Sequence, residues 1–142
     1  MANPEIKNFN KDSIVQTSIA PWLSVELCAK ALDFYKSAFG ATEVYRLEAP
    51  DGSPIVARLS VDGAEFWLSE ESLDNGDLIP KAYRASTIRL ILTVTDPDSL
   101  YGQALKAGAS QIFPVGEEHG WRVGRLVDPF GHQWEIGRPL RV

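Results

Sequence analysis

The feature that most constrains this chain is an internal repeat. The first copy has the pattern of a strand, a helix and three more strands, over Ser18–Val25, Ala29–Phe39, Thr42–Leu47, Ile55–Val61 and Ala64–Ser69. The second copy repeats that order over Thr87–Thr95, Asp98–Lys106, Gln111–Phe113, Arg122–Val127 and His132–Gly137. Because duplication determines the architecture, we expect an α+β fold of two βαβββ units. Unit one covers about 18–70 and unit two about 87–138, joined by 71–86 within a single domain of residues 1–142.

Composition narrows the class of protein. A chain of 142 residues has the size of one domain, and its net charge of -5 argues against nucleic-acid binding. The single cysteine, Cys28, excludes an intrachain disulfide, and we interpret it as a buried structural thiol. No apolar stretch approaches the roughly 20 residues of a membrane span, and residues 1–11 lack the apolar core of a signal peptide. We therefore expect a cytoplasmic protein with no membrane partner.

Two motifs carry a family resemblance. The first helix reads Ala31-Leu32-Asp33-Phe34-Tyr35 and ends in Phe39-Gly40-Ala41, and the last strand follows Asp128-Pro129-Phe130-Gly131-His132-Gln133-Trp134-Glu135. With the repeat, they resemble the vicinal oxygen chelate superfamily of glyoxalases, bleomycin-resistance proteins and dioxygenases. The run from Gly120 to Arg125 is similar to its small glyoxalase-like branch associated with phosphonate operons. The resemblance implies a curved mixed sheet around a cleft and a homodimer.

Alternation along the strands predicts which side chains face that cleft, because successive side chains in a strand point to opposite faces. The set that we assign to the helix-covered core includes Ile19, Leu23, Val25, Ile88, Leu90, Leu92 and Val94. The opposite, open face then carries three tryptophans, three arginines and a glutamate, which we predict to bind ligand: Trp22, Arg58, Trp67, Arg89, Trp121, Arg125 and Glu135.

The resemblance also implies four places for metal ligands, which fall here on Ala20, Trp67, Arg89 and Glu135. Alanine and tryptophan donate no lone pair to a metal, and arginine stays protonated. Only Glu135 has a suitable donor, whereas a divalent transition metal needs three or more. His119 and His132 are interpreted as loop and turn residues. We therefore predict no metal and no other cofactor.

Three functions remain open on the sequence alone. The first is a metal-independent binding protein for a small planar ligand that is anionic or bears a carbonyl, since arginines beside tryptophans suit such a molecule. The second is an enzyme, a lyase, isomerase or thiol transferase in which Glu135 is the catalytic base or a metal ligand. The third is a regulatory or scaffolding subunit with an unused cleft. Whether the units pair within one chain or between chains also stays open, as does a closing role for loop 70–86.

Overall fold

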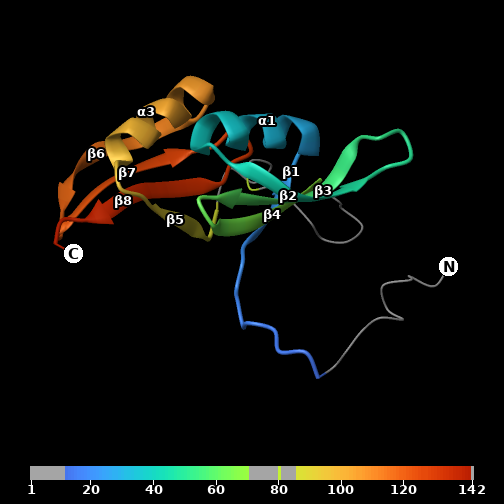
Figure 1. Cartoon of the computed structure of the whole chain (residues 1–142). Helices are drawn as coiled ribbons and strands as arrows, with labels where there is room; N and C mark the ends of the chain where they lie inside the picture. The colour runs from blue at the N-terminus through green and yellow to red at the C-terminus, as the bar shows by residue number, and fades with distance from the viewer. Residues whose placement is uncertain (1–11, 71–79, 81–85, 142) are drawn as a thin grey trace.

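The computed structural model describes residues 12–70, 80 and 86–141, which form two βαβββ units (Figure 1). Unit one contains β1 (Trp22–Val25), α1 (Cys28–Phe39), β2 (Thr42–Glu48), β3 (Pro54–Val61) and β4 (Ala64–Glu70). Unit two contains β5 (Arg89–Thr93), α3 (Pro97–Ala107), β6 (Ser110–Glu118), β7 (Trp121–Val127) and β8 (Gln133–Pro139). The predicted fold class and element order are confirmed. Loop 70–86 lies almost wholly outside the described residues.

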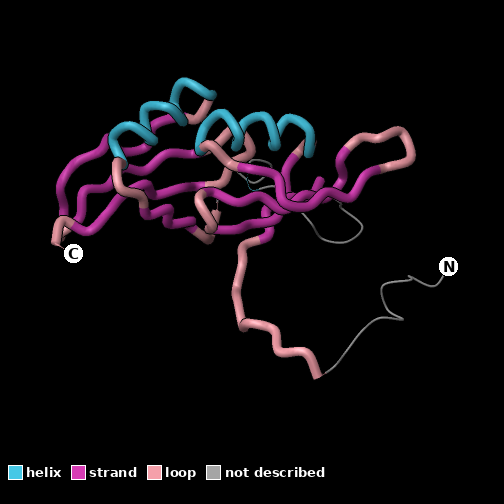
Figure 2. The backbone as a smooth tube through the Cα atoms, viewed as in Figure 1, coloured by secondary structure: helices cyan, strands magenta, loops and turns pink. Residues whose placement is uncertain are grey.

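Each unit forms its own mixed sheet of four strands. The order is β1-β4-β3-β2 in sheet one and β5-β8-β7-β6 in sheet two, and β1–β4 and β5–β8 are the parallel pairs. Helices α1 and α3 lie on the same side of the two sheets (Figure 2). No described helix covers the opposite side of either sheet, and we call these two surfaces the open faces.

The helices follow from local sequence. In α1 the apolar residues recur at helical spacing and are buried, and Gly40 ends the helix with a φ of 68°, a left-handed conformation that glycine adopts at little cost. In α3 the carboxylate of Asp96 accepts the backbone N–H of Ser99, and Pro97 occupies the first turn, where its missing N–H is not needed.

A buried carboxylate joins the two units. Asp128 of unit two accepts hydrogen bonds from the hydroxyl of Tyr35 in α1 at 2.5 Å and from the indole N–H of Trp134 at 2.9 Å. Its other oxygen accepts the backbone N–H groups of Phe130 and His132, both at 3.0 Å. Since the side chain is almost fully buried, these bonds replace the water it loses. The Asp-Pro-Phe-Gly-His motif therefore serves to dock one unit on the other.

The first strand is shorter than predicted. Ser18–Val25 was expected to be extended within the sheet, but β1 begins at Trp22, Ala20 precedes it, and Ile19 is 99% exposed instead of buried. The carbonyl of Pro21 accepts the N–H of Trp67, and the next bond of a parallel ladder requires the N–H of residue 21, which proline lacks. The placement of Ile19 in the core and of Ala20 on the sheet was therefore wrong.

Ile88 is a second correction. It was assigned to the core, but β5 begins one residue later at Arg89 and Ile88 is 68% exposed. Leu92, further along the same strand, is buried as predicted.

Among the described residues, no helix is long and apolar enough to cross a bilayer.

Candidate functional site

The open face of sheet one carries a row of aromatic rings and one cation. Strand register places Trp22, Trp67, Arg58 and Tyr45 side by side on β1, β4, β3 and β2. The two indoles stack with centroids 5.3 Å apart and planes within 10°, and the Arg58 guanidinium carbon lies 5.1 Å from the Trp67 ring centroid. The indole N–H of Trp22 donates to the Ser69 hydroxyl at 2.7 Å, which holds the outer ring in place.

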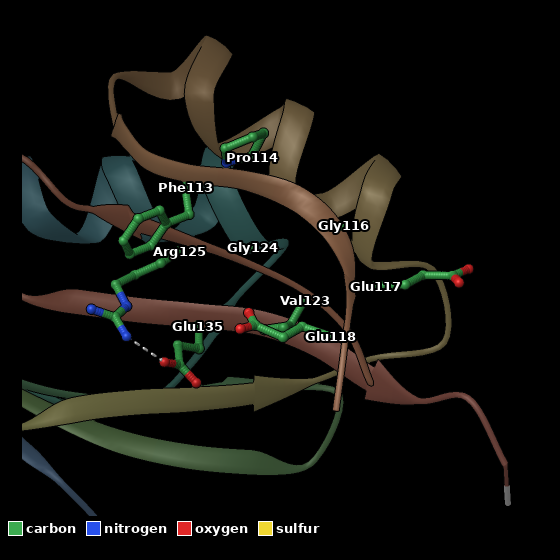
Figure 3. Close-up of a pocket in the computed structure, with 9 residues that line it drawn as sticks. All are labelled: Phe113, Pro114, Gly116, Glu117, Glu118, Val123, Gly124, Arg125 and Glu135. Carbon is green, nitrogen blue, oxygen red and sulfur yellow. Dashed lines mark hydrogen bonds and ion pairs between the residues drawn. The ribbon is translucent and has the colours of Figure 1, made fainter. Parts of the chain in front are cut away.

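The open face of sheet two carries one carboxylate between two guanidinium groups. The Glu135 Oε1 atom lies 3.1 Å from Arg89 Nη1 and 3.0 Å from Arg125 Nη2, as Figure 3 shows for Arg125. Phe113 on the neighbouring strand lies beneath the Arg125 guanidinium, with 5.3 Å between its ring centroid and the guanidinium carbon. One carboxylate thus faces two positive charges, so the group as a whole is cationic.

The two units use the same backbone device to build these groups. A register shift precedes Tyr45 in β2, and a matching shift precedes Phe113 in β6. Each shift brings an aromatic residue opposite an arginine, giving the equivalent pairs Tyr45–Arg58 and Phe113–Arg125. Sequence reasoning missed both aromatic residues because a bulge breaks the alternation from which faces are assigned. The signal in the sequence was the aromatic residue in the strand that follows the helix of each unit, Tyr45 in the first and Phe113 in the second.

Sheet two also has a groove. A cavity of about 670 Å³ is lined by β6, β7 and β8, with Phe113, Val123, Arg125 and Glu135 among its walls (Figure 3). A second cavity of about 430 Å³ adds Ile91, His119 and Trp121 and shares Glu118, Val123 and Glu135 with the first. The shared residues make the two cavities one continuous groove. Its size suits a small organic ligand.

The structure separates the predicted site residues into two groups. Trp22, Arg58 and Trp67 lie on sheet one, whereas Arg89, Trp121, Arg125 and Glu135 lie on sheet two. Within the described part of the chain, no hydrogen bond, ion pair or ring contact joins the two groups. Whether these seven residues bind a ligand stays a prediction.

The superfamily's metal-ligand places do not fit a metal in this chain. Ala20 lies outside β1, Trp67 presents an indole stacked on Trp22, and the cationic Arg89 contacts the carboxylate of Glu135. No group of three or more His, Cys, Asp or Glu lies together among residues 12–70, 80 and 86–141. Of these four places, Glu135 alone supplies a donor atom that a divalent metal accepts.

Of three other polar candidates, Cys28 and His132 are buried and His119 is exposed. Cys28 is fully buried, and burial, helped by the negative charge of Glu70, raises its pKa from 9.0 to about 11, so the unreactive thiol form dominates at neutral pH. A ring nitrogen of His132 lies 2.8 Å from the carbonyl of Ser24 in unit one. His119 is exposed at the β6–β7 turn, on the rim of the groove.

Comparison with known proteins agrees with this architecture. Residues 14–136 match the model of the Glyoxalase/Bleomycin resistance protein/Dioxygenase superfamily, and the chain belongs to that superfamily. The chain is 35% identical over 131 residues to the uncharacterized protein Mb0911c of Mycobacterium bovis, covering 89% of this chain and 86% of that protein.

Solved structures show the same fold. An Arabidopsis thaliana gene product is 27% identical with a TM-score of 0.68, covering 87% of this chain and all of that one. The fosfomycin resistance protein FosX of Listeria monocytogenes has a TM-score of 0.63 at 16% identity, covering 88% of this chain and 94% of that one. At that identity the likeness to FosX concerns the fold alone.

Proposed function

We propose that this protein binds a small planar molecule carrying a negative or carbonyl oxygen, without a metal, in the groove of sheet two. The observation that carries the proposal is the Glu135 carboxylate, which lines the groove and lies between Arg89 and Arg125; of these two arginines, Arg125 also lines the groove. Glu135 offsets only one of the two guanidinium charges, and Glu117 and Glu118 also line the groove. The guanidinium donors that remain suit a carboxylate or carbonyl, and the aromatic walls suit a flat ring.

We also propose that the functional unit is a homodimer. Large apolar side chains are exposed on both open faces, including Trp22 and Tyr45 on sheet one and Ile91 and Phe113 on sheet two. Exposed apolar surface of this kind favours association, and twofold pairing is its commonest form. A twofold axis that sets sheet one of one subunit against sheet two of its partner brings both groups of site residues into one cleft. Membership of the phosphonate-operon branch is part of the same proposal.

Tryptophan fluorescence tests the ligand class. The probes are 2-naphthoate, 2-naphthylmethylammonium and 2-naphthalenemethanol, which share a flat ring and differ in charge. We expect naphthoate to bind best. We expect Arg125→Gln to weaken its binding about tenfold, the effect of one charge-assisted hydrogen bond of about 1.4 kcal/mol. Arg122→Gln is the matched control, since Arg122 pairs with Asp98 away from the groove. Preference for the cationic probe, or equal losses in both variants, contradicts the proposal.

One observation favours the enzyme as a second candidate. Both guanidinium contacts of Glu135 involve Oε1, and among the described residues Oε2 has no ion-pair or hydrogen-bond partner. A carboxylate oxygen open to a groove is placed to remove a proton from a bound carbonyl compound. Glu135→Gln separates the two functions. A binding site gains affinity for naphthoate when that negative charge is removed, whereas an isomerase or lyase loses its turnover.

A further inference from the structure

The two units meet at two junctions that the repeat relates to each other. At the first, the turn between β7 and β8 lies against the end of β1, and a ring nitrogen of His132 lies 2.8 Å from the carbonyl oxygen of Ser24. At the second, the turn between β3 and β4 lies against the end of β5, where Ala64 and Thr93 line the same cavity. Each junction thus joins the turn between the last two strands of one unit to the first strand of the other.

The turns at the two junctions carry different side chains. Gly63 and Gly131 occupy equivalent places, with φ values of 92° and 94°, and Ala64 follows the first glycine as His132 follows the second. The imidazole of His132 is buried in its junction, whereas the methyl group of Ala64 is exposed. An alanine therefore stands in unit one where unit two has a heteroaromatic ring.

The strands that receive these turns are equivalent as well. In the parallel pairs β1–β4 and β5–β8, Ser24 and Thr93 lie opposite residues that are the same number of places beyond the turn glycine. The Thr93 carbonyl is thus the counterpart of the Ser24 carbonyl that His132 contacts. The residue after each differs in burial, since Val25 is fully buried and Val94 is only partly buried.

The Thr93 carbonyl faces the open edge of its sheet. Strand β5 is the outer strand of sheet two, and the N–H of Val94 donates to the Gly137 carbonyl in β8. Because alternate residues of a strand direct their backbone groups to opposite sides, Thr93 directs its carbonyl away from β8. The second junction therefore presents the same backbone acceptor as the first, without a histidine to contact it.

A cavity of about 520 Å³ occupies this junction. Val61, Leu92 and Val94 are among its apolar walls, and Asp62 and Arg138 are its charged lining residues. None of its lining residues lines the groove of sheet two. The cavity is therefore separate from the site proposed above, and its occupant is a separate question.

Arg138 and Asp62 bring one charge of each sign to the cavity. The Arg138 Nη1 atom donates to the Thr95 carbonyl at 3.1 Å, and its Nε atom donates to the Pro139 carbonyl at 3.3 Å. A guanidinium has more N–H groups than these two bonds use, and a carboxylate is the partner that suits them best. The Asp62 carboxylate and the Thr93 carbonyl, in turn, suit an N–H donor. The cavity therefore complements a molecule that carries both kinds of group.

We propose that this cavity binds a small azole, a flat ring with a nitrogen-bound hydrogen, that also carries a carboxylate. The ring takes the place that the His132 imidazole has in the other junction. Its N–H donates to the Thr93 carbonyl, its carboxylate contacts Arg138, and the apolar walls cover its faces.

An NMR titration of the backbone amides of the full chain with imidazole-4-acetate tests the site. We expect saturable shifts at Ala64, Thr93 and Thr95 and none at Val123 or Gly124 in the groove of sheet two. The comparison probe is the same compound methylated on its ring N–H. Both are added at about pH 9, where the ring is neutral and only the first keeps an N–H donor. We expect the methylated probe to bind about tenfold more weakly, the effect of one hydrogen bond.

Ala64→His should close the site with the chain's own ring. We expect this variant to bind imidazole-4-acetate at least about tenfold more weakly, because the new side chain fills the cavity as His132 fills the other junction. Ala29→His is the matched control, since it adds the same ring at an exposed position of α1.

Arg138→Gln tests the place of the carboxylate. We expect it to weaken imidazole-4-acetate at least about fivefold and to leave 4-methylimidazole, which has no carboxylate, within about twofold.

Several results would overturn the inference. They are the absence of saturable shifts at Ala64 and Thr93, shifts confined to the groove of sheet two, equal affinity for the two ring probes, and equal losses in Ala64→His and Ala29→His. Equal weakening of both Arg138→Gln probes overturns the placement of the carboxylate. Since these variants lie outside the groove of sheet two, naphthoate binding there still tests the proposed function independently.

Discussion

Replacing Asp128 by asparagine is the sharpest test of how the two units are held together. Asparagine has the same shape, so the change creates no cavity and alters only charge and hydrogen bonding. One carboxylate oxygen accepts two backbone N–H groups, and we expect the amide oxygen to keep these bonds. The amide NH₂ then faces the Tyr35 hydroxyl, which rotates to accept from it, and the Trp134 N–H, which has no acceptor.

The cost follows from these contacts. Losing the charge weakens the two retained bonds by about 1 kcal/mol each, and a buried N–H without an acceptor costs about 1–3 kcal/mol. We expect Asp128→Asn to lower the free energy of unfolding by about 3–5 kcal/mol. That is a large part of the roughly 5–15 kcal/mol that stabilises a typical domain. Urea unfolding followed by tryptophan fluorescence measures the loss.

Tyr35→Phe supplies the second side of a double-mutant cycle. Burial raises the pKa of Tyr35 well above its ordinary value, and the Asp128 charge raises it further, so the hydroxyl remains a donor. We expect Tyr35→Phe alone to cost about 1–2 kcal/mol, and less in the asparagine background because the charged acceptor is gone. A loss below about 1 kcal/mol for Asp128→Asn, or strict additivity with Tyr35→Phe, refutes the reasoning.

Three further predictions concern packing, protonation and the tryptophan pair. A Cβ at Gly137 would lie 2.6 Å from the Arg122 carbonyl oxygen, so Gly137→Ala should lower the free energy of unfolding by about 3 kcal/mol. Gly102 lies in the middle of α3 with no atom near its Cβ position, so Gly102→Ala should raise that free energy by about 0.5–1 kcal/mol in the same assay. Burial raises the pKa of Cys28 from 9.0 to about 11, so the protonated thiol favours the folded state below pH 9 and this contribution is lost as pH rises through about 11. Over this range the free energy of unfolding of wild type should fall by about 2–3 kcal/mol more than that of Cys28→Ala. Parallel pH profiles of the two unfolding free energies would contradict the assignment. Stacked indoles couple their electronic transitions, so Trp22→Phe should remove an exciton couplet from the far-ultraviolet circular dichroism that Trp121→Phe leaves intact.

Much of the fold can be predicted from the sequence because it depends on local patterns. Apolar spacing and terminal glycines locate both helices to within a residue or two, and alternation assigns Leu23, Leu59 and Leu92 to the buried face. The repeat predicts the order of every described strand. These signals are readable because helix and strand periodicity arise within a few consecutive residues.

The candidate site is only partly predictable in the same way. Alternation places Glu135, Arg89 and Arg125 on the open face. It does not show that the two guanidinium groups share one carboxylate oxygen of Glu135. It also misses Tyr45 and Phe113, because a bulge is a property of two paired strands and not of one.

The sequence by itself determined that a βαβββ unit occurs twice and which residues alternate along its inner strands. The tertiary structure alone decided that the tryptophan row and the glutamate with its arginines lie on two different sheets. It also decided that Asp128 docks unit two on Tyr35 of unit one. The physical reason is that periodicity is set by neighbours along the chain, whereas these contacts join residues that lie from 10 to 93 positions apart in the sequence. Only the packing of complete units brings such residues together.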